Sequence, residues 1–207
     1  MRKINISLFA LCVACTQEPQ TQQVEEETQP APEMVTWKVD FGSSDTDEWF
    51  ALNDDVMGGV SEGDAYFSDS TVVFEGEVST ANNGGFVSLR SPIASYDLSD
   101  FSQVEIAYKS QGHSFTMVLA NNVAWYMPQF RHEATSASEE WTTVTLPLYD
   151  FKQYVMTGYG QSETDVEMST EHLSDVVQIE LINSAFESGE FRLEIDYIEF
   201  QGFVDEE

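Results

Sequence analysis

Basic residues are scarce in this chain of 207 residues. Eight Lys plus Arg stand against 37 Asp plus Glu, which gives a formal net charge of −29 at pH 7. A surface this acidic repels the phosphate backbone of nucleic acids and the anionic head groups of lipids. The imbalance therefore excludes a nucleic-acid partner, and it excludes adsorption of the folded body to an anionic membrane.

Cysteine is nearly absent too, since the chain holds two, Cys12 and Cys15. Cleavage before Cys15 would leave a body without disulfides, so its stability must come from its core. Long apolar runs are also missing: residues 4–14 are apolar but too few to span a bilayer as a helix. This run follows the basic residues Arg2 and Lys3, which is typical of a secretory signal.

The run ends in L-C-V-A-C, which resembles a bacterial lipobox, where the cysteine is lipidated and becomes the first mature residue. The match is incomplete, because Cys12 stands where a large aliphatic residue is usual. We predict a signal over residues 1–15 and a lipid anchor on Cys15, which places the protein in the cell envelope, in the periplasm or at the outer membrane. The alternative is a plain cleaved signal and secretion.

Residues 16–35 consist largely of Gln, Glu, Thr and Pro, with no basic residue. Low hydrophobicity and like charge predict a disordered acidic tether between the anchor and a folded domain over residues 36–203. That domain alternates polar and apolar residues, the pattern of half-buried strands. Predicted strands cover residues 37–41, 71–78, 86–91, 103–110, 114–120, 125–130, 141–147, 176–183 and 190–201.

Short helices are expected at residues 171–176 and around Phe50. Many short strands without βαβ alternation predict an all-β fold, a two-sheet jelly-roll β-sandwich. In the last predicted strand, Phe191, Leu193 and Ile195 share one face, but Ile198 and Phe200 share the other. This change of face predicts either a strand that bends across the sandwich or one that is buried on both faces near its end.

Two polar, glycine-rich segments are the strongest candidates for a binding loop. The first signature segment (residues 53–61) contains Asn53, Asp54, Asp55, Met57, Gly58, Gly59 and Ser61. The second signature segment (residues 83–90) contains Asn83, Gly84, Gly85, Phe86 and Arg90. Apolar residues between the glycines of the first segment predict a loop folded back onto the core. We predict that Arg90 pairs with Asp54 or Asp55 and fixes this loop to the strand that carries the arginine.

Residues 59–63 also match G-x-S-x-G, the nucleophile turn of α/β-hydrolases, with Ser61 as the nucleophile. That turn requires a strand before the serine and a helix after it, and no helix is expected here. His113, His132 and His172 are scattered, without cysteine partners, so they form no zinc set. A hydrolase at Ser61, or at paired acids that spacing cannot identify, remains a minor alternative.

Two further ligand types deserve a test. Acids at residues 45–48 and 53–55 could supply oxygens to a structural Ca²⁺, although neither stretch has EF-hand spacing, and no other metal or cofactor is expected. Trp125, Tyr126 and Trp141 could stack on a sugar or a peptide. The alternative for these acids is an ordinary solvated surface, and for the aromatics it is packing in the core or at its rim.

Taken in order, the motifs resemble the complex I intermediate-associated protein 30 family. The resemblance rests on W…LNDDVMGGVS (residues 49–61), FEGEVS…NNGGFVSLR (74–90), WTTVTLPL…F (141–151) and GEFRLEIDYI (189–198). It covers residues 37–200 and implies a galactose-binding-like jelly roll. Mitochondrial members of the family are non-enzymatic, chaperone-like assembly factors for respiratory complex I, which work on the matrix side of the membrane.

These observations lead to two function hypotheses. The first is a non-enzymatic binding or assembly module, monomeric, with a protein partner, anchored outside the cytoplasm and touching the membrane only through its lipid. The alternative is a carbohydrate-binding module of the cell envelope, with a glycan partner.

Overall fold

The structure, a computed structural model, describes residues 33–43, 48–157, 160–183, 185 and 187–204, except the side chains of Val56 and Met57. The chain divides into two units, Met1–Ala31 and Pro32–Glu207, and the described residues belong to the second unit. The predicted signal, Cys15 and residues 16–32 of the predicted tether lie outside the described residues, so these predictions stay predictions.

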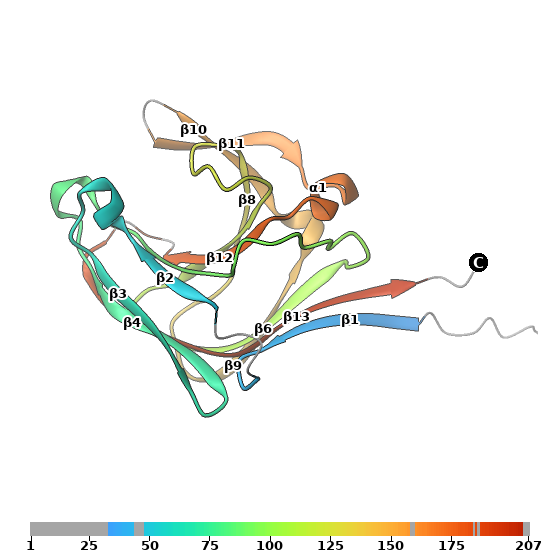
Figure 1. Ribbon diagram of the computed structural model, residues 1–207, viewed down its shortest axis with the longest axis horizontal. Helices are drawn as coiled ribbons and strands as arrows, with labels where there is room; N and C mark the ends of the chain where they lie inside the picture. Colours follow the sequence, from blue (N-terminus) through green and yellow to red (C-terminus); the bar gives the residue numbers. More distant parts are fainter. Residues whose placement is uncertain (1–32, 44–47, 158–159, 184, 186, 205–207) are drawn as a thin grey trace, which may run out of the picture. The chain divides into compact units, whose positions relative to one another are not determined.

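The described chain forms two antiparallel sheets in two layers (Figure 1). The six-stranded sheet has the order β3-β4-β13-β6-β9, with β1 also paired to β13; the seven-stranded sheet has the order β11-β10-β8-β7-β12-β5-β2. The strands are β1 (Glu33–Asp40), β2 (Phe50–Asn53), β3 (Glu62–Ser68), β4 (Thr71–Val78), β5 (Val87–Arg90), β6 (Gln103–Gln111), β7 (Phe115–Ala120), β8 (Gln129–Glu133), β9 (Ser138–Pro147), β10 (Lys152–Thr157), β11 (Gly160–Glu167), β12 (Gln178–Asn183) and β13 (Gly189–Val204). The predicted all-β sandwich is confirmed.

Short helical segments link some of the strands. They are α1 (Thr170–Ser174) and the 3-10 turns η2 (Asp54–Met57), η3 (Ala81–Asn83) and η4 (Leu148–Asp150). In the part of the chain that the structure describes, no helix is long and apolar enough to cross a membrane.

The core lies between the two sheets. Ile106 of β6 and Leu181 of β12 come from opposite sheets, and both are fully buried in one apolar cluster. Because successive side chains of a strand point to opposite faces, each sheet has one face in this core and one that points away from it. We call the second the outer face of each sheet, and a ligand must meet the molecule there or at its loops.

β13 is the central strand of the six-stranded sheet. Its first half pairs with β4 and its second half with β1, while β6 pairs along its other edge. The pairing with β6 shifts register between Ile195 and Tyr197, which is a β-bulge. The extra residue explains the change of face predicted from the sequence, because it returns the strand's later apolar residues to the core, where Phe191, Leu193, Ile195, Ile198 and Phe200 are all buried.

Several predicted elements are wrong or displaced. The strand expected at residues 125–130 starts at Gln129 instead, and residues 121–128 form an irregular loop between β7 and β8. The helix expected around Phe50 is the strand β2, which pairs with β5. β1 begins at Glu33, inside the segment predicted as tether. The helix expected at residues 171–176 is confirmed as α1, with Ser169 as its N-cap.

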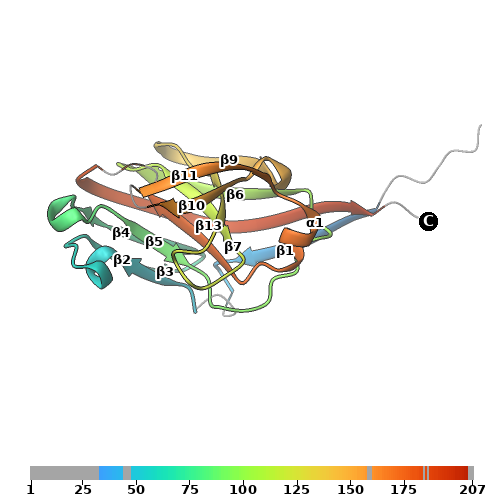
Figure 2. The ribbon, with the colours of Figure 1, turned by 90° about the horizontal axis from the view of Figure 1, so that it is seen from above.

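β1 and the end of β13 leave the body together as a two-stranded ribbon (Figure 2). Met34 lies opposite Phe203 near its end, and both side chains are exposed. β1 pairs with β13 alone, so one edge of the ribbon is unpaired within the described residues.

Candidate functional site

Asp54 joins the two signature segments. It opens η2 directly after β2, and its side chain is fully buried. Its Oδ1 accepts the backbone N–H of Ser61 at 2.9 Å, and its Oδ2 accepts the Ser61 hydroxyl at 2.6 Å. Oδ2 also accepts the backbone N–H groups of Gly85 at 2.5 Å and Phe86 at 3.3 Å. One carboxylate therefore closes its own loop and fastens it to the second segment.

Asp54 remains charged in this buried place because of these donors. Burial alone would raise the pKa of the carboxyl, but the hydrogen bonds from Ser61, Gly85 and Phe86 outweigh burial and hold the pKa of Asp54 below its usual value. Both oxygens of the carboxylate therefore already accept hydrogen bonds from the two signature segments.

The glycines of both segments leave room for this carboxylate. A Cβ atom on Gly59 would lie 2.2 Å from Cγ of Asp54, and one on Gly84 would lie 2.4 Å from its Oδ2. Gly58 has open space around it but a φ of +89°, a left-handed conformation that glycine adopts without strain. The Gly-Gly pairs therefore serve the packing of Asp54 and one tight turn.

Two asparagines complete the loop. Asn53 donates from Nδ2 to the carbonyl of Gly63 at 3.0 Å, and its Oδ1 is buried without a hydrogen-bond partner in the described chain. Asn183, the last residue of β12, accepts the N–H of Val87 at 2.9 Å and donates to the carbonyl of Gly85 at 2.9 Å. Asn183 was not expected from the sequence, where it is one of three polar residues in β12 with Gln178 and Glu180.

The other predicted loop residues are placed less tightly. Asp55 and Asn83 are exposed, and Asn83 has a left-handed φ of 60°. The side chain of Met57 lies outside the described residues. The signature segments thus form a hydrogen-bonded structural unit, with Asp55 and Asn83 as exposed polar side chains and Val60 as an exposed apolar one.

The predicted partner of Arg90 is wrong. Arg90 pairs with Glu180 at 3.1 Å, and its Nε donates to the hydroxyl of Ser88 at 2.9 Å. The register explains this choice, because β5 and β12 place Arg90 directly opposite Glu180. Asp54 is held by N–H and O–H donors instead. Burial raises the pKa of Glu180, and the nearby guanidinium groups of Arg90 and Arg131 oppose that rise.

The hydrolase alternative at Ser61 fails on geometry. Ser61 is 3% exposed, and its hydroxyl is hydrogen-bonded to Asp54. No histidine ring among the described residues is hydrogen-bonded to Ser61: His132 bonds the carbonyl of its neighbour and His172 bonds the N-cap of α1. His113 is buried against Phe191. A serine held this way has no histidine to act as its base, and its burial leaves no open approach for a substrate.

The proposed calcium ligands are only partly described. Residues 45–47 lie outside the described residues, and at the second stretch both oxygens of Asp54 already accept hydrogen bonds. Across the described ranges, no group of three or more His, Cys, Asp or Glu side chains is arranged to hold a metal ion.

The three predicted ligand aromatics do not lie together: two are in a loop and one is on a strand of the other sheet. Trp125 and Tyr126 lie in the β7–β8 loop, 54% and 60% exposed, with their rings packed edge to face. Val123 and Met127 in the same loop are exposed too, which makes its tip apolar. Trp141 lies on β9 of the six-stranded sheet, with Nζ of Lys109 4.7 Å from the centre of its ring. The structure therefore brings together two of the three.

Polar side chains gather on the outer face of the seven-stranded sheet. We use "rung" for residues directly opposite one another across neighbouring strands. One rung runs from β2 to β11 through Phe50, Arg90, Glu180, Val118, Arg131, Lys152 and Glu167. The next contains Gln178, Ala120, Gln129, Tyr154 and Glu163. Their sequence neighbours Leu89, Ile179 and Phe130 are in the core, so these side chains point away from it.

The sequence gives no sign of this face, because its members are spread over seven strands. Its buried polar side chains include Gln129, Gln178 and Glu180. The guanidinium of Arg131 donates to Oε1 of Gln129 at 2.9 Å and to Gln161, and it lies 5.7 Å from the ring of Tyr154. The phenol of Tyr154 donates to Glu163 at 3.1 Å. Burial of the phenol raises the pKa of Tyr154, and the bond to Glu163 raises it further. The face is a pre-arranged set of hydrogen-bonding groups.

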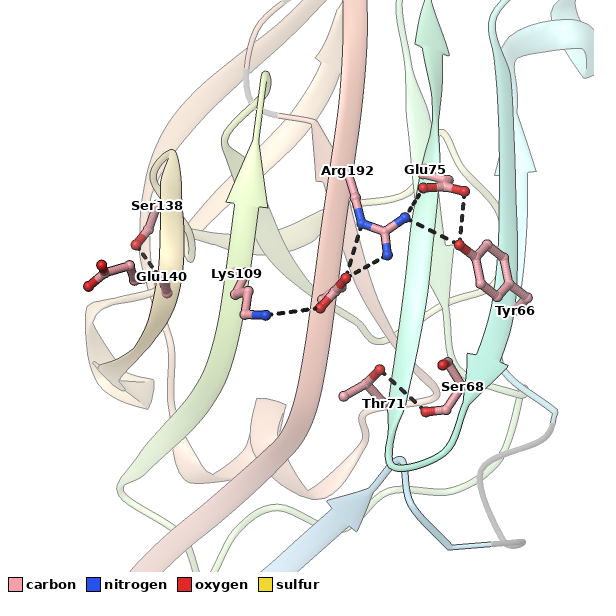
Figure 3. A network of polar contacts seen from close by, with 9 residues as sticks. Tyr66, Ser68, Thr71, Glu75, Lys109, Ser138, Glu140 and Arg192 are labelled. Carbon is pink, nitrogen blue, oxygen red and sulfur yellow. Dashed lines mark hydrogen bonds and ion pairs between the residues drawn. The ribbon is translucent and has the colours of Figure 1, made fainter.

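The outer face of the six-stranded sheet carries an acidic network (Figure 3). Arg192 donates to Glu75, to Glu194 at 2.5 Å and to the hydroxyl of Tyr66 at 3.2 Å, and Lys109 lies 3.5 Å from Glu194. The hydrogen bonds from Arg192 lower the pKa of Glu194. The neighbouring rung holds Glu62, Glu77 and Glu190, and these residues and Arg192 line an open groove of about 630 Å³.

Arg192→Ala is expected to lower the free energy of unfolding by about 1 kcal/mol at low salt, because its partners are partly exposed and screened. The loss should shrink at high salt, because salt screens the repulsion among the carboxylates that remain in the variant. Urea unfolding at two salt concentrations measures both values. Lys109→Ala, which removes a single longer ion pair, is the matched control and should lose less. An equal loss at both salt concentrations would contradict this explanation.

The fold and its loops define a galactose-binding-like jelly roll. A family 11 carbohydrate-binding module from Clostridium thermocellum, solved with a β-1,3-1,4-mixed-linked tetrasaccharide, matches with a TM-score of 0.52 and 14% identity over 77% of this chain and 91% of that chain. An agarase structure matches with a TM-score of 0.51 and 13% identity over 80% of this chain and 24% of that chain. At these identities the likeness establishes the fold alone.

The family model of complex I intermediate-associated protein 30 matches residues 39–195, and the chain belongs to that family. A comparison with curated proteins gave no match.

Proposed function

We propose that this protein is a non-catalytic binding module that takes a carbohydrate chain on the outer face of its seven-stranded sheet. The observation that carries the proposal is the two polar rungs of that face. They place Arg, Glu, Gln and Tyr side chains side by side on a rigid sheet, largely fixed by bonds to one another. Sugars present dense hydroxyl groups, which need donors and acceptors held in advance in suitable positions.

The β7–β8 loop supplies exposed aromatic rings, which a sugar site needs in addition to polar groups. Trp125 and Tyr126 are exposed, and their loop leads directly into Gln129 and Arg131 of β8. Aromatic faces pack against the apolar C–H face of a sugar ring while polar groups bond its edge. A fold shared with a module solved in complex with a tetrasaccharide is compatible with this use but does not establish it.

Isothermal titration of the protein with the mixed-linked tetrasaccharide and with a panel of envelope oligosaccharides tests the proposal. We expect at least one saccharide to bind. Trp125→Ala should weaken that binding about tenfold or more, since truncated aromatic anchors typically lose over 1 kcal/mol. Trp141→Ala is the matched control, because that tryptophan lies on the other sheet, and it should change the affinity less than twofold.

The assembly role implied by the family is the second candidate. The exposed apolar tip of the β7–β8 loop favours it, since such patches mark sites of protein contact. If no saccharide binds, the carbohydrate proposal is contradicted and docking of a protein on this tip becomes the better account. Loss of saccharide binding in Trp141→Ala but not in Trp125→Ala would also contradict a binding site on the outer face of the seven-stranded sheet.

A further inference from the structure

Some Lys and Arg side chains of this protein form ion pairs with carboxylates and others do not. Six Lys or Arg residues follow the predicted signal, among 37 acids in the whole chain. Four of the six have a carboxylate within ion-pair distance, namely Lys38, Arg90, Lys109 and Arg192. For Arg131 and Lys152, no carboxylate of the described chain lies within that distance. With so many acids available, two cations without a carboxylate partner call for an explanation.

Arg131 and Lys152 are direct neighbours. They lie opposite each other in the rung that crosses the seven-stranded sheet, on its outer face. Like charges directly opposite one another destabilise a sheet, so this pair weakens the fold unless something neutralises it. Glu167 lies opposite Lys152 on the edge strand β11, outside ion-pair distance.

Within the described residues, the contacts of Arg131 include no ion pair, although Glu180 is near enough to interact with its charge. Its guanidinium bonds the neutral amide oxygens of Gln129 and Gln161, and its Nε is buried without an acceptor in the described chain. Two acids of this face bind other groups: Glu180 pairs with Arg90, and Glu163 accepts the Tyr154 hydroxyl. A guanidinium forms its strongest contacts with a planar or tetrahedral oxyanion.

We infer that the saccharide bound on this face carries an anionic substituent, a carboxylate or a sulfate ester, placed against Arg131 and Lys152. The inference rests on the proposed function and narrows its ligand class. Gln129, Gln161 and Tyr154 then contact the hydroxyl groups around the anionic substituent. Arg90 stays with Glu180 and frames the site from the side of β5.

The test compares three tetrasaccharides of equal length by titration calorimetry of the full chain: the neutral mixed-linked glucan, an oligouronate and a sulfated oligosaccharide. An anionic one should bind about tenfold tighter than the neutral one at low salt, and the advantage should fall as salt rises. The uronate and sulfate arms distinguish the two anions. Free sulfate alone should bind far more weakly than either saccharide.

Arg131→Gln should abolish most of the anionic advantage, measured as the ratio of the anionic to the neutral affinity. The neutral affinity should fall too, because Arg131 also holds Gln129 and Gln161 in place. Lys152→Gln changes an exposed position, so it should fold even if Arg131→Gln does not. It should also reduce the anionic advantage. Lys109→Gln removes a cation from the other sheet and is the matched control, with no change expected. Equal binding of neutral and anionic saccharides overturns this inference but leaves the proposed function standing. Binding of no saccharide overturns both.

Discussion

Asp54→Ala is expected to lower the free energy of unfolding by about 3–5 kcal/mol, one of the largest effects of any single change in this protein. The carboxylate is fully buried and accepts the N–H groups of Ser61, Gly85 and Phe86 as well as the Ser61 hydroxyl. Its removal leaves buried donors without an acceptor, and each such donor loses roughly 1–3 kcal/mol. Chemical denaturation followed by tryptophan fluorescence measures the change.

Asp55→Ala is the matched control, because this neighbouring acid is exposed. It should change stability by less than about 0.5 kcal/mol. Asp54→Asn retains the size of the side chain but offers an N–H₂ group to backbone donors, so it should also be strongly destabilising. Near-native stability of Asp54→Asn would show that shape, and not the accepting carboxylate, holds the two signature segments together.

The same carboxylate predicts how stability depends on pH. The folded-state pKa of Asp54 is below its ordinary value, so the folded protein binds its proton less readily than the unfolded chain. Its contribution is therefore complete above the unfolded pKa, about 3.9, and is lost as pH falls through the lower folded pKa. The difference in stability between the native protein and Asp54→Ala should shrink over that range.

Gly59→Ala should destabilise the protein by about 3 kcal/mol. The added Cβ would lie 2.2 Å from Cγ and Oδ1 of Asp54, well inside contact distance. Overpacking of this kind usually costs about 1–3 kcal/mol, and the upper end applies because the hydrogen bonds fix the carboxylate in place. Thermal and urea unfolding of the purified variant provide the measurement.

Gly58→Ala separates packing from backbone strain. Nothing lies within 4 Å of the Cβ that this change adds, but its φ of +89° is unfavourable for alanine. We expect a loss of about 1 kcal/mol. The double variant Asp54→Ala/Gly59→Ala should lose less than the sum of the single variants, since removal of the carboxylate makes room for the new methyl group. Strict additivity would disprove the steric explanation.

The fold was largely predictable where burial imposes alternation. In β13 the alternating apolar residues predicted the strand, and its bulge accounts for the change of face. β4 also has the predicted bounds, residues 71–78, although Val72, Val73 and Phe74 are buried in succession. β10 and β11 were missed because the pair lies at a sheet edge, where β11 is almost entirely exposed. Residues there need no apolar alternation, so the sequence carries little sign of them.

The candidate site was predictable only in part. The signature segments stood out because each combines Asn or Asp with adjacent glycines within a few residues, which is the composition of a turn. The predicted pairing of Arg90 failed, because charge alone does not reveal the register that sets Arg90 opposite Glu180. The polar rungs were invisible for the same reason, since a rung takes one residue from each strand and joins segments far apart in the chain.

The arrangement of β13 also dictates the order in which the fold can be completed. It is the last strand of the described chain, and β1, β4 and β6 all pair with it. Until residues 189–204 leave the ribosome, those three strands lack their common neighbour, and the six-stranded sheet cannot close. Pairing of β1 with β13 spans nearly the whole domain, so contact order is high and folding is correspondingly slow. The earlier part of the chain must remain incompletely folded until its final strand arrives.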